Sequence, residues 1–318
     1  MRPTGALHIG HLFGALGNWV TLQDEFECIY CVVDLHALTT AYENVGEVHR
    51  HGIEMVADWI ACGVDPERSI IFRQSDVAEH SELAVLLGMI TPLPWLERVP
   101  TYKGQIAELG EGIDTYGFLG YPLLQAADII LYKATHVPVG QDQLPHLELA
   151  REVVRRFNHL YGDVFPEPQP RLAESPLILG TDNRKMSKSY GNTITLGMPD
   201  DEIDKLVMSM ITDPQRIRRS DPGRPEICNV FSYHRLFGAP PDDLEAIYEG
   251  CTTATLGCVD DKRNLAARVR ATIGPIRERR DALMHDADRI EEILRDGAER
   301  ARAIARPVMA EARAAMGL

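Results

Sequence analysis

His8-Ile9-Gly10-His11 opens an apolar segment, Leu12 to Leu22, whose spacing predicts a helix. A glycine-containing turn at a helix start presents free backbone N–H groups and a positive helix end to a polyphosphate. The two imidazoles are three positions apart, so they lie near one helical face and can both reach phosphate oxygens. The turn predicts a polyphosphate site, although His-x-x-His alone is equally compatible with an ordinary helix start.

A second stretch, Lys185-Met186-Ser187-Lys188-Ser189, begins 177 residues after His8 (185 − 8). It places two ammonium groups three residues apart, with hydroxyls beside them. Cations of this kind can follow negative charge onto a leaving pyrophosphate. This order of residues is uncommon by chance, so the second stretch is a more specific signal than His-x-x-His alone.

Between these stretches, strand and helix patterns alternate. Cys28 to Val33 and Ser69 to Arg73 are apolar runs typical of strands covered on both faces, and Val48 to Cys62 is an amphipathic helix. The alternation predicts an α/β fold, a doubly wound parallel (Rossmann-like) sheet. From residue 198 the pattern is helical and rich in Ala, Arg and Glu. We therefore expect a sheet domain over 1–197 and an all-α domain over 198–318, with the last helix docking back on the sheet domain.

Composition narrows the class of protein. A net charge of −14 over 318 residues argues against an indiscriminate nucleic-acid coat and against a DNA partner. RNA contact through a local patch stays open, because Gln215 to Arg224 and Lys262 to Arg280 are basic. We expect no membrane span, no secretory leader and a cytoplasmic location, with the six cysteines as free thiols.

Asp128 is the most informative residue of the middle of the chain. It lies in the apolar run Ala126 to Leu131, in a segment expected to be a helix with Pro122 near its first turn. A buried carboxylate without partners is expensive, so Asp128 is expected to have a specific partner unless it lies at the helix surface. His36 follows a predicted strand at its carboxyl end, where open α/β sheets bind ligands, and is either a pocket or a structural histidine.

With these motifs, the chain resembles the class I aminoacyl-tRNA synthetases. Its middle block resembles the bacterial tryptophanyl branch of that family. That block has Tyr121-Pro122 and Ala126-Ala127-Asp128-Ile129, followed by Val137-Pro138-Val139-Gly140-Gln141-Asp142-Gln143. The likeness continues through Thr212-Asp213-Pro214 and Cys228-Asn229-Val230-Phe231.

The resemblance implies ATP-dependent activation of L-tryptophan, with Mg²⁺, and transfer to the 3′ end of tRNA(Trp) by a homodimer. It implies four catalytic residues: His8, His11, Lys185 and Lys188. The implied ATP contacts are Arg2, Thr4, Gly10, His11, Asp142, Lys185, Met186, Ser187 and Lys188. The implied tryptophan contacts are Tyr121, Gln125, Asp128, Gln143 and His36. Asp128 is expected to accept the indole N–H, because an indole offers one donor and no acceptor.

Three alternatives remain at this level. A tyrosyl enzyme shares both signature stretches, and a small nucleotidylyltransferase would share the first. A catalytically inactive paralogue that binds RNA or an amino acid is a third. In the family a buried strand precedes the His-x-x-His turn, whereas here only Met1 to Gly5 do. We therefore expect the natural protein to begin upstream.

The cysteines of the helical part carry the last expectation. Cys228, Cys251 and Cys258 are spaced as in a subset of tryptophanyl enzymes that bind a four-iron cluster through four cysteines, but the fourth position here is Asp261. A carboxylate binds cluster iron less tightly than a thiolate does. Two outcomes stay open, a labile cluster or an empty remnant, and we favour an empty or oxygen-sensitive site.

Overall fold

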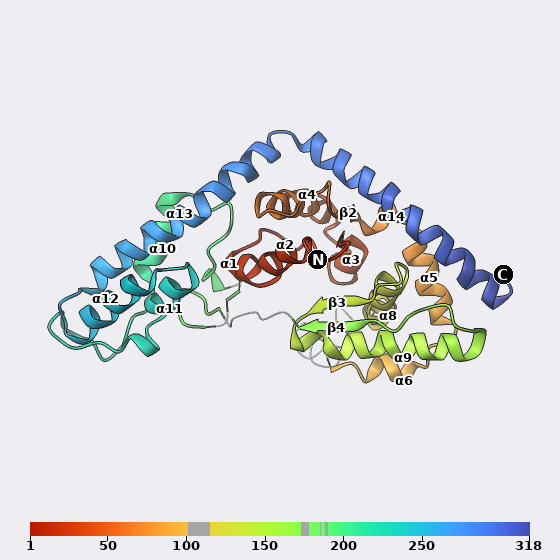
Figure 1. Ribbon diagram of the computed structural model, residues 1–318, viewed down its shortest axis with the longest axis horizontal. Helices are drawn as coiled ribbons and strands as arrows, with labels where there is room; N and C mark the ends of the chain where they lie inside the picture. Colours follow the sequence, from red (N-terminus) through yellow and green to blue (C-terminus); the bar gives the residue numbers. More distant parts are fainter. Residues whose placement is uncertain (101–114, 173–177, 185, 188–189) are drawn as a thin grey trace.

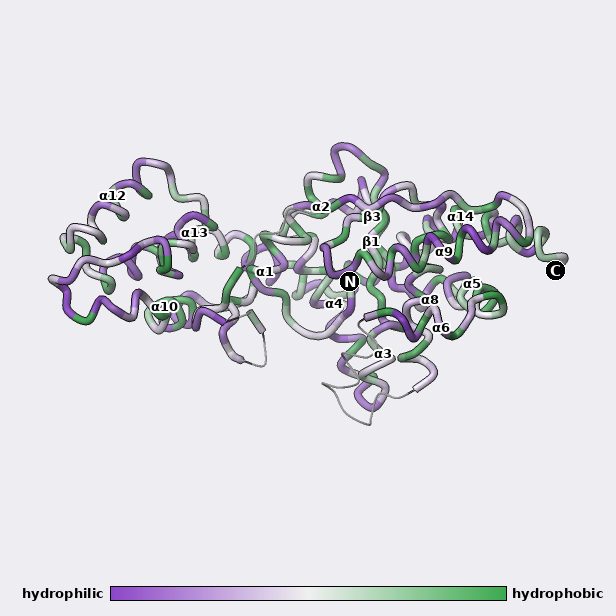
Figure 2. Tube along the Cα trace, turned by 90° about the horizontal axis from the view of Figure 1, so that it is seen from below, coloured by the Kyte–Doolittle hydropathy of each residue, from purple (hydrophilic) through white to green (hydrophobic). Residues whose placement is uncertain are grey.

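The structure is a computed structural model that describes residues 1–100, 115–172, 178–184, 186–187 and 190–318. The molecule is elongated (Figures 1 and 2), with α10, α12 and α13 at one end and the carboxyl end of α14 at the other. Two long helices, α13 (Cys258–Met284) and α14 (Ala287–Met316), run along one side and join these ends. The sheet elements lie beneath them.

The first motif begins a continuous helical segment made of α1 (Ile9–His11), η1 (Leu12–Leu16, a π-helical turn) and α2 (Gly17–Leu22). Before it, His8 forms an antiparallel bridge with Thr195. The Ile9 amide donates to the Ile194 carbonyl at 3.0 Å, and the Leu196 amide donates to the Leu7 carbonyl at 3.0 Å. The chain that follows the lysine-rich loop is therefore paired directly with the chain that enters the histidine turn.

The described strands form two separate two-stranded parallel sheets. β1 (Ile29–Val32) pairs with β2 (Ile70–Arg73), with Ile29 opposite Ile70, and Met1 lies along β1 through hydrogen bonds to Cys31 and Val33. β3 (His136–Val139) pairs with β4 (Gln169–Leu172). α3 (Asp34–Ala41) and α4 (Val45–Ala61) connect β1 to β2. Parallel strands joined by crossover helices confirm the predicted α/β class.

The connection from β2 to β3 is mostly helical. It contains η2 (Gln74–Asp76), α5 (Glu79–Gly88), α6 (Leu93–Glu97) and α8 (Tyr116–Ile130). The expectation that Pro122 lies in a first turn is wrong, because α8 begins at Tyr116 with Thr115 as its N-cap and contains Pro122 in its interior. Beyond β3, η4 (Gln141–Gln143) leads into α9 (Leu144–Tyr161).

The remaining chain is helical. It comprises α10 (Asp200–Ser209), η6 (Pro225–Ile227), α11 (Asn229–Leu236) and α12 (Pro241–Thr252), followed by α13 and α14. One apolar core includes Trp59 of α4 together with Val230 of α11 and Ile273 of α13, so it extends through both predicted domains. The division at residues 197 and 198 stays a prediction.

α14 packs on β2, and Gly297 lies directly against the backbone of that strand. A Cβ built on Gly297 would lie 1.8 Å from the Ile71 carbonyl oxygen, a distance that no side chain can occupy. Nearby, the Arg73 guanidinium donates to both oxygens of Glu291 at 3.0 and 3.1 Å. Among the described residues, no helix is both long and apolar enough to cross a membrane.

Candidate functional site

A cavity of about 340 Å³ opens between the carboxyl end of β1 and helix α8. That volume falls in the range of small-molecule sites. Six residues singled out from the sequence line it: Arg2, His36, Tyr121, Gln125, Asp128 and Gln143. Five further residues complete the lining: Met1, Val33, Thr39, Phe118 and His146.

Asp128 is the charged centre of this cavity. His36 Nε2 lies 2.9 Å from Asp128 Oδ2, and His80 Nδ1 lies 2.6 Å from Oδ1. Gln74 Nε2 donates to both carboxylate oxygens, at 2.7 and 2.9 Å. The expectation that this carboxylate has specific partners is therefore met by three N–H donors from three different elements.

These partners decide the charge of Asp128. Burial by itself raises the pKa of a carboxyl group, but hydrogen bonds from His36 and His80 outweigh it and lower the pKa of Asp128 to about 2. The carboxylate is therefore ionised at neutral pH. An ionised carboxylate only accepts hydrogen bonds, so the cavity presents a strong, fixed acceptor.

Polar and aromatic groups surround that acceptor. The Tyr121 hydroxyl lies 3.5 Å from His146 Nε2, and burial lowers the pKa of His146, which keeps the imidazole neutral. The rings of Phe118 and Tyr121 lie 5.5 Å apart, a spacing typical of interacting aromatic pairs. The cavity thus combines apolar ring surfaces with one anion.

Sequence reasoning missed Gln74, His80, Phe118 and His146. Gln74 follows β2 directly, so the rule that applied to His36 after β1 would have found it. His80 has no comparable signal, because it lies within the first turn of α5.

The histidine turn has a defined hydrogen-bond pattern. The Gly10 amide donates to His8 Nδ1 at 3.1 Å, and the His8 amide donates to His11 Nδ1 at 3.2 Å. Because both Nδ1 atoms accept, the proton of each neutral imidazole lies on Nε2. The ring centroids are 4.0 Å apart, so the two imidazoles lie against each other at the start of the helix. A pair of donors at the start of a helix suits phosphate oxygens.

Met186, from the lysine-rich stretch, lies beside this turn. A Cβ built on Gly10 would be 2.8 Å from the His8 ring and 3.4 Å from Met186 Sδ, so glycine is needed for this close approach. The Ser187 amide donates to Asn192 Oδ1 at 2.8 Å. Met186 is therefore brought to the turn and Ser187 is held by Asn192, whereas Lys185 and Lys188 lie outside the described residues.

The other expected ATP contacts are more dispersed. Arg2 lines the cavity, and the Thr4 amide donates to the Arg2 carbonyl at 3.0 Å. Asp142, in η4, is exposed and accepts from Gln143 Nε2 at 2.7 Å. Neither Thr4 nor Asp142 lines the cavity itself.

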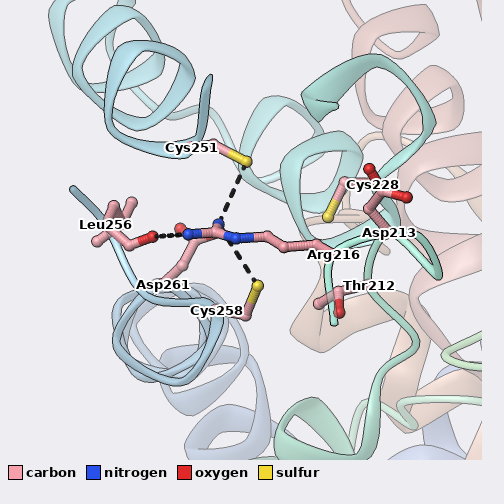
Figure 3. Close-up of a pocket in the computed structure, with 8 residues that line it drawn as sticks. All are labelled: Thr212, Asp213, Arg216, Cys228, Cys251, Leu256, Cys258 and Asp261. Carbon is pink, nitrogen blue, oxygen red and sulfur yellow. Dashed lines mark hydrogen bonds between the residues drawn. The ribbon is translucent and has the colours of Figure 1, made fainter. Parts of the chain in front are cut away.

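A separate pocket in the helical part brings Cys228, Cys251, Cys258 and Asp261 together (Figure 3), as their spacing suggested. The Arg216 guanidinium lies between two of the sulfurs, with Nη1 at 3.6 Å from both Cys251 Sγ and Cys258 Sγ.

These residues do not fit an iron–sulfur cluster. The remaining cavity is only about 10 Å³, and Asp261 Oδ1 lies 3.0 Å from His234 Nε2. Burial also raises the pKa of the Cys228 and Cys251 thiols, whereas cluster ligands are thiolates. No group of three or more His, Cys, Asp or Glu side chains in the described ranges is arranged to hold a metal ion.

The basic patch expected at Gln215 to Arg224 is smaller than its sequence suggests. Arg216 points into the cysteine pocket, and the Arg224 guanidinium donates to Asp213 at 2.6 and 2.9 Å. Arg218 and Arg219 are exposed. In the second basic region, Arg268, Arg270, Arg277 and Arg280 all pair with aspartates.

Comparisons with known proteins agree with this geometry. The family described as tRNA synthetases class I (W and Y) matches residues 1–274. The tryptophan–tRNA ligase of Thermotoga maritima is 50% identical over 320 residues, covering 100% of this chain and 98% of the relative. The corresponding ligase of Aquifex aeolicus is 45% identical and covers 100% and 98%.

A solved structure is similarly close. The tryptophanyl-tRNA synthetase of Campylobacter jejuni, complexed with ADP and tryptophan, superposes with a TM-score of 0.93 at 33% identity, covering 100% of this chain and 98% of that one. A full-length match in sequence agrees with a full-length match in fold. The chain therefore belongs to the class I tRNA synthetases of the tryptophan and tyrosine group.

Proposed function

We propose that the chain activates L-tryptophan with ATP to form tryptophanyl-adenylate and transfers the amino acid to the 3′ end of tRNA(Trp). The observation that carries the assignment of the site is the ionised Asp128 carboxylate in a cavity lined by Tyr121, Gln125 and Gln143. The relatives named tryptophan–tRNA ligase favour tryptophan over tyrosine and an active enzyme over an inactive paralogue.

In the first step, a carboxylate oxygen of tryptophan attacks the α-phosphorus of ATP, a P–O bond forms, and pyrophosphate leaves with the electron pair of the broken bond. The protein contributes position and charge rather than a covalent intermediate. His8 and His11 donate from Nε2 to phosphate oxygens, and Gly10 allows the nucleotide to approach the backbone. Lys185 and Lys188 neutralise charge on the departing pyrophosphate. When bound with ATP, Mg²⁺ would supply further positive charge to the phosphates.

Asp128 sets the amino-acid specificity. It accepts the indole N–H, whereas a ring without a donor adds no further hydrogen bond to the carboxylate in the desolvated cavity. A site built on such a bond can discriminate by about 10⁴ without an editing step. Tyr121 and Gln143 bind the ammonium group of the substrate.

Pyrophosphate exchange tests the function and the role of Asp128 together. The wild-type chain is expected to exchange pyrophosphate into ATP with tryptophan and not with tyrosine. Asp128→Ala is expected to lower kcat/KM for tryptophan on the order of 10²-fold or more, because the substrate donor loses its acceptor. A folded Asp128→Ala protein with near-native exchange would contradict the assignment.

We also propose a homodimer that works in the cytoplasm. Val85, Met89, Leu93 and Tyr116 are large apolar side chains with 57% or more of their surface exposed. Val85 is in α5 and Met89 directly follows it, while Leu93 begins α6 and Tyr116 begins α8. Exposed apolar groups gathered in one region typically mark a protein interface. Sedimentation of Met89→Glu is expected to give a monomer under conditions where the wild type is a dimer.

Finally, we propose that the cysteine pocket works without an iron–sulfur cluster. The support is Arg216, whose guanidinium lies between Cys251 and Cys258, and the commitment of Asp261 to His234.

A further inference from the structure

We propose that His80, fixed by Tyr132, is a positioning residue for tryptophan recognition: it aims the Asp128 carboxylate into the cavity from behind. This inference rests on the proposed role of Asp128 as the indole acceptor. It adds a specificity determinant that does not touch the substrate.

His80 is separated from the cavity but not from its anion. The side chain is 0% exposed and is absent from the cavity lining. Its Nδ1 lies 2.6 Å from Asp128 Oδ1, while its Nε2 lies 2.7 Å from the Tyr132 hydroxyl. The imidazole therefore bridges a carboxylate on α8 and a phenol just beyond the end of that helix.

With a neutral His80 imidazole, the bridge has one consistent assignment of protons. An ionised carboxylate only accepts, so His80 Nδ1 carries a hydrogen. His80 Nε2 then accepts from the Tyr132 hydroxyl, which keeps its proton because burial raises the pKa of Tyr132. Tyr132 thus selects the tautomer of His80, and that tautomer is the one that donates to Asp128.

The other two partners of Asp128 cannot replace His80. His36 lines the cavity and donates to Oδ2, so it lies on the side from which the ligand arrives. Gln74 donates from a single nitrogen to both carboxylate oxygens, so it does not favour one oxygen of Asp128 over the other. Of these three donors, His80 is the one that combines complete burial with a bond to one defined oxygen.

The decisive readout is discrimination, because a purely structural histidine would affect every substrate alike. The probe is the isostere of tryptophan in which sulfur replaces the ring N–H, compared with tryptophan in pyrophosphate exchange. The ratio of the two kcat/KM values measures how well Asp128 accepts the indole donor. In the wild type we expect a ratio of about 10² or more.

Two substitutions of His80 separate position from bulk. His80→Asn retains an amide N–H close to the place of Nδ1, and His80→Leu fills a similar volume without any donor. We expect His80→Leu to lower the ratio by at least about 10-fold, the value of one hydrogen bond to a charged group. His80→Asn is expected to keep it within about 3-fold of the wild type on the same scale. Equal ratios for wild type and His80→Leu, or for the two variants, would overturn the proposal.

Tyr132→Phe provides a milder variant that decides the question if His80→Leu does not fold. It removes one hydroxyl and is expected to lower the ratio by about 3- to 10-fold. Tyr161→Phe is the matched control, because Tyr161 packs against the same core through Phe157. A wild-type ratio near one would instead show that Asp128 is not the indole acceptor, which is a failure of the proposed site and not of His80 alone.

Discussion

Asp128 and Arg216 are both charged side chains enclosed by the protein, one beside the sheet and one in the helical end. Asp128 is held by N–H donors and has a cavity of about 340 Å³ beside it. Arg216 donates to the carbonyls of Arg219 and Leu256 at 3.1 and 2.8 Å and has only about 10 Å³ beside it. Asp128 therefore has room for a ligand beside it, whereas the hydrogen bonds of Arg216 are made within the protein. A buried charge thus acts as a recognition group or as a cross-link, depending on the space next to it.

The largest expected effect comes from neutralising the first charge without changing its size. Asp128→Asn leaves the donors of His36, His80 and Gln74 without an anion and points an amide N–H at one of them. We expect a loss of about 3–5 kcal/mol in the free energy of unfolding, as for other broken buried charge pairs. Urea denaturation at neutral pH measures it. The control is Asp142→Asn, which changes an exposed carboxylate; a difference below about 1 kcal/mol between the two would contradict the comparison.

Acid should remove part of this contribution by protonating Asp128. The pKa of Asp128 in the folded protein is about 2, against an ordinary value of 3.8. A lowered pKa means that the stabilisation is complete above pH 3.8 and is lost as the pH falls through 2; it amounts to roughly 2.5 kcal/mol. The stability gap between wild type and Asp128→Asn should therefore narrow between pH 4 and 2.

The cysteine pocket should respond at the opposite end of the pH scale. Burial raises the pKa of Cys228 and Cys251 above the ordinary value of 9.0, so their contribution is complete below that pH and is lost as the pH rises beyond it. For Asp128, a stability difference between wild type and Asp128→Asn that stays constant from pH 4 to 2 would show that its charge does not stabilise the fold.

Arg216→Leu tests the cross-link. It removes two charge-assisted hydrogen bonds to carbonyls and leaves those carbonyls unpaired, which should cost about 2 kcal/mol. For a chain of this size that corresponds to a fall of several degrees in Tm, measured by calorimetry, while pyrophosphate exchange at 25 °C persists. Arg218→Leu is the control, because Arg218 is exposed. If both variants melt together with the wild type, Arg216 is not a cross-link.

The smallest expected signal is the iron content. Protein purified without oxygen should contain far less than the roughly four irons per chain of a cubane cluster, and Asp261→Cys should not raise that content while Arg216 is present. Iron and sulfide analysis measures both. A stoichiometric cluster in the wild type would contradict the comparison, because the cysteine pocket would then hold a ligand as the Asp128 cavity does.

Local sequence patterns predicted several residues that line the cavity, but not the residues that hold Asp128 in place. The need of Asp128 for a partner followed from one carboxylate in an apolar run, and His36 followed from its place after a strand. The partner His80 could not be predicted, because which donors meet at a carboxylate depends on tertiary packing between α5 and α8. The prediction at Pro122 was wrong for a related reason. Proline is favoured in the first turn of a helix, but tertiary packing determined that α8 begins six residues earlier, at Tyr116.

The cysteine pocket shows the same limit from the other side. Sequence spacing predicted that Cys228, Cys251 and Cys258 share a neighbourhood, which they do. It could not predict that a side chain from the preceding loop enters between two of them, because Arg216 carries no pattern that distinguishes it from Arg218 or Arg219.

The close contact at Gly297 predicts a temperature-sensitive variant. A methyl group there would lie 1.8 Å from the Ile71 carbonyl oxygen, three positions before Gln74, so Gly297→Ala has to displace α14 or the strand beneath it. Neither shift removes a group that touches amino acid or nucleotide. A cell that carries Gly297→Ala should grow at low temperature and lack charged tRNA at high temperature. Translation in such a cell could then be slowed by raising the temperature.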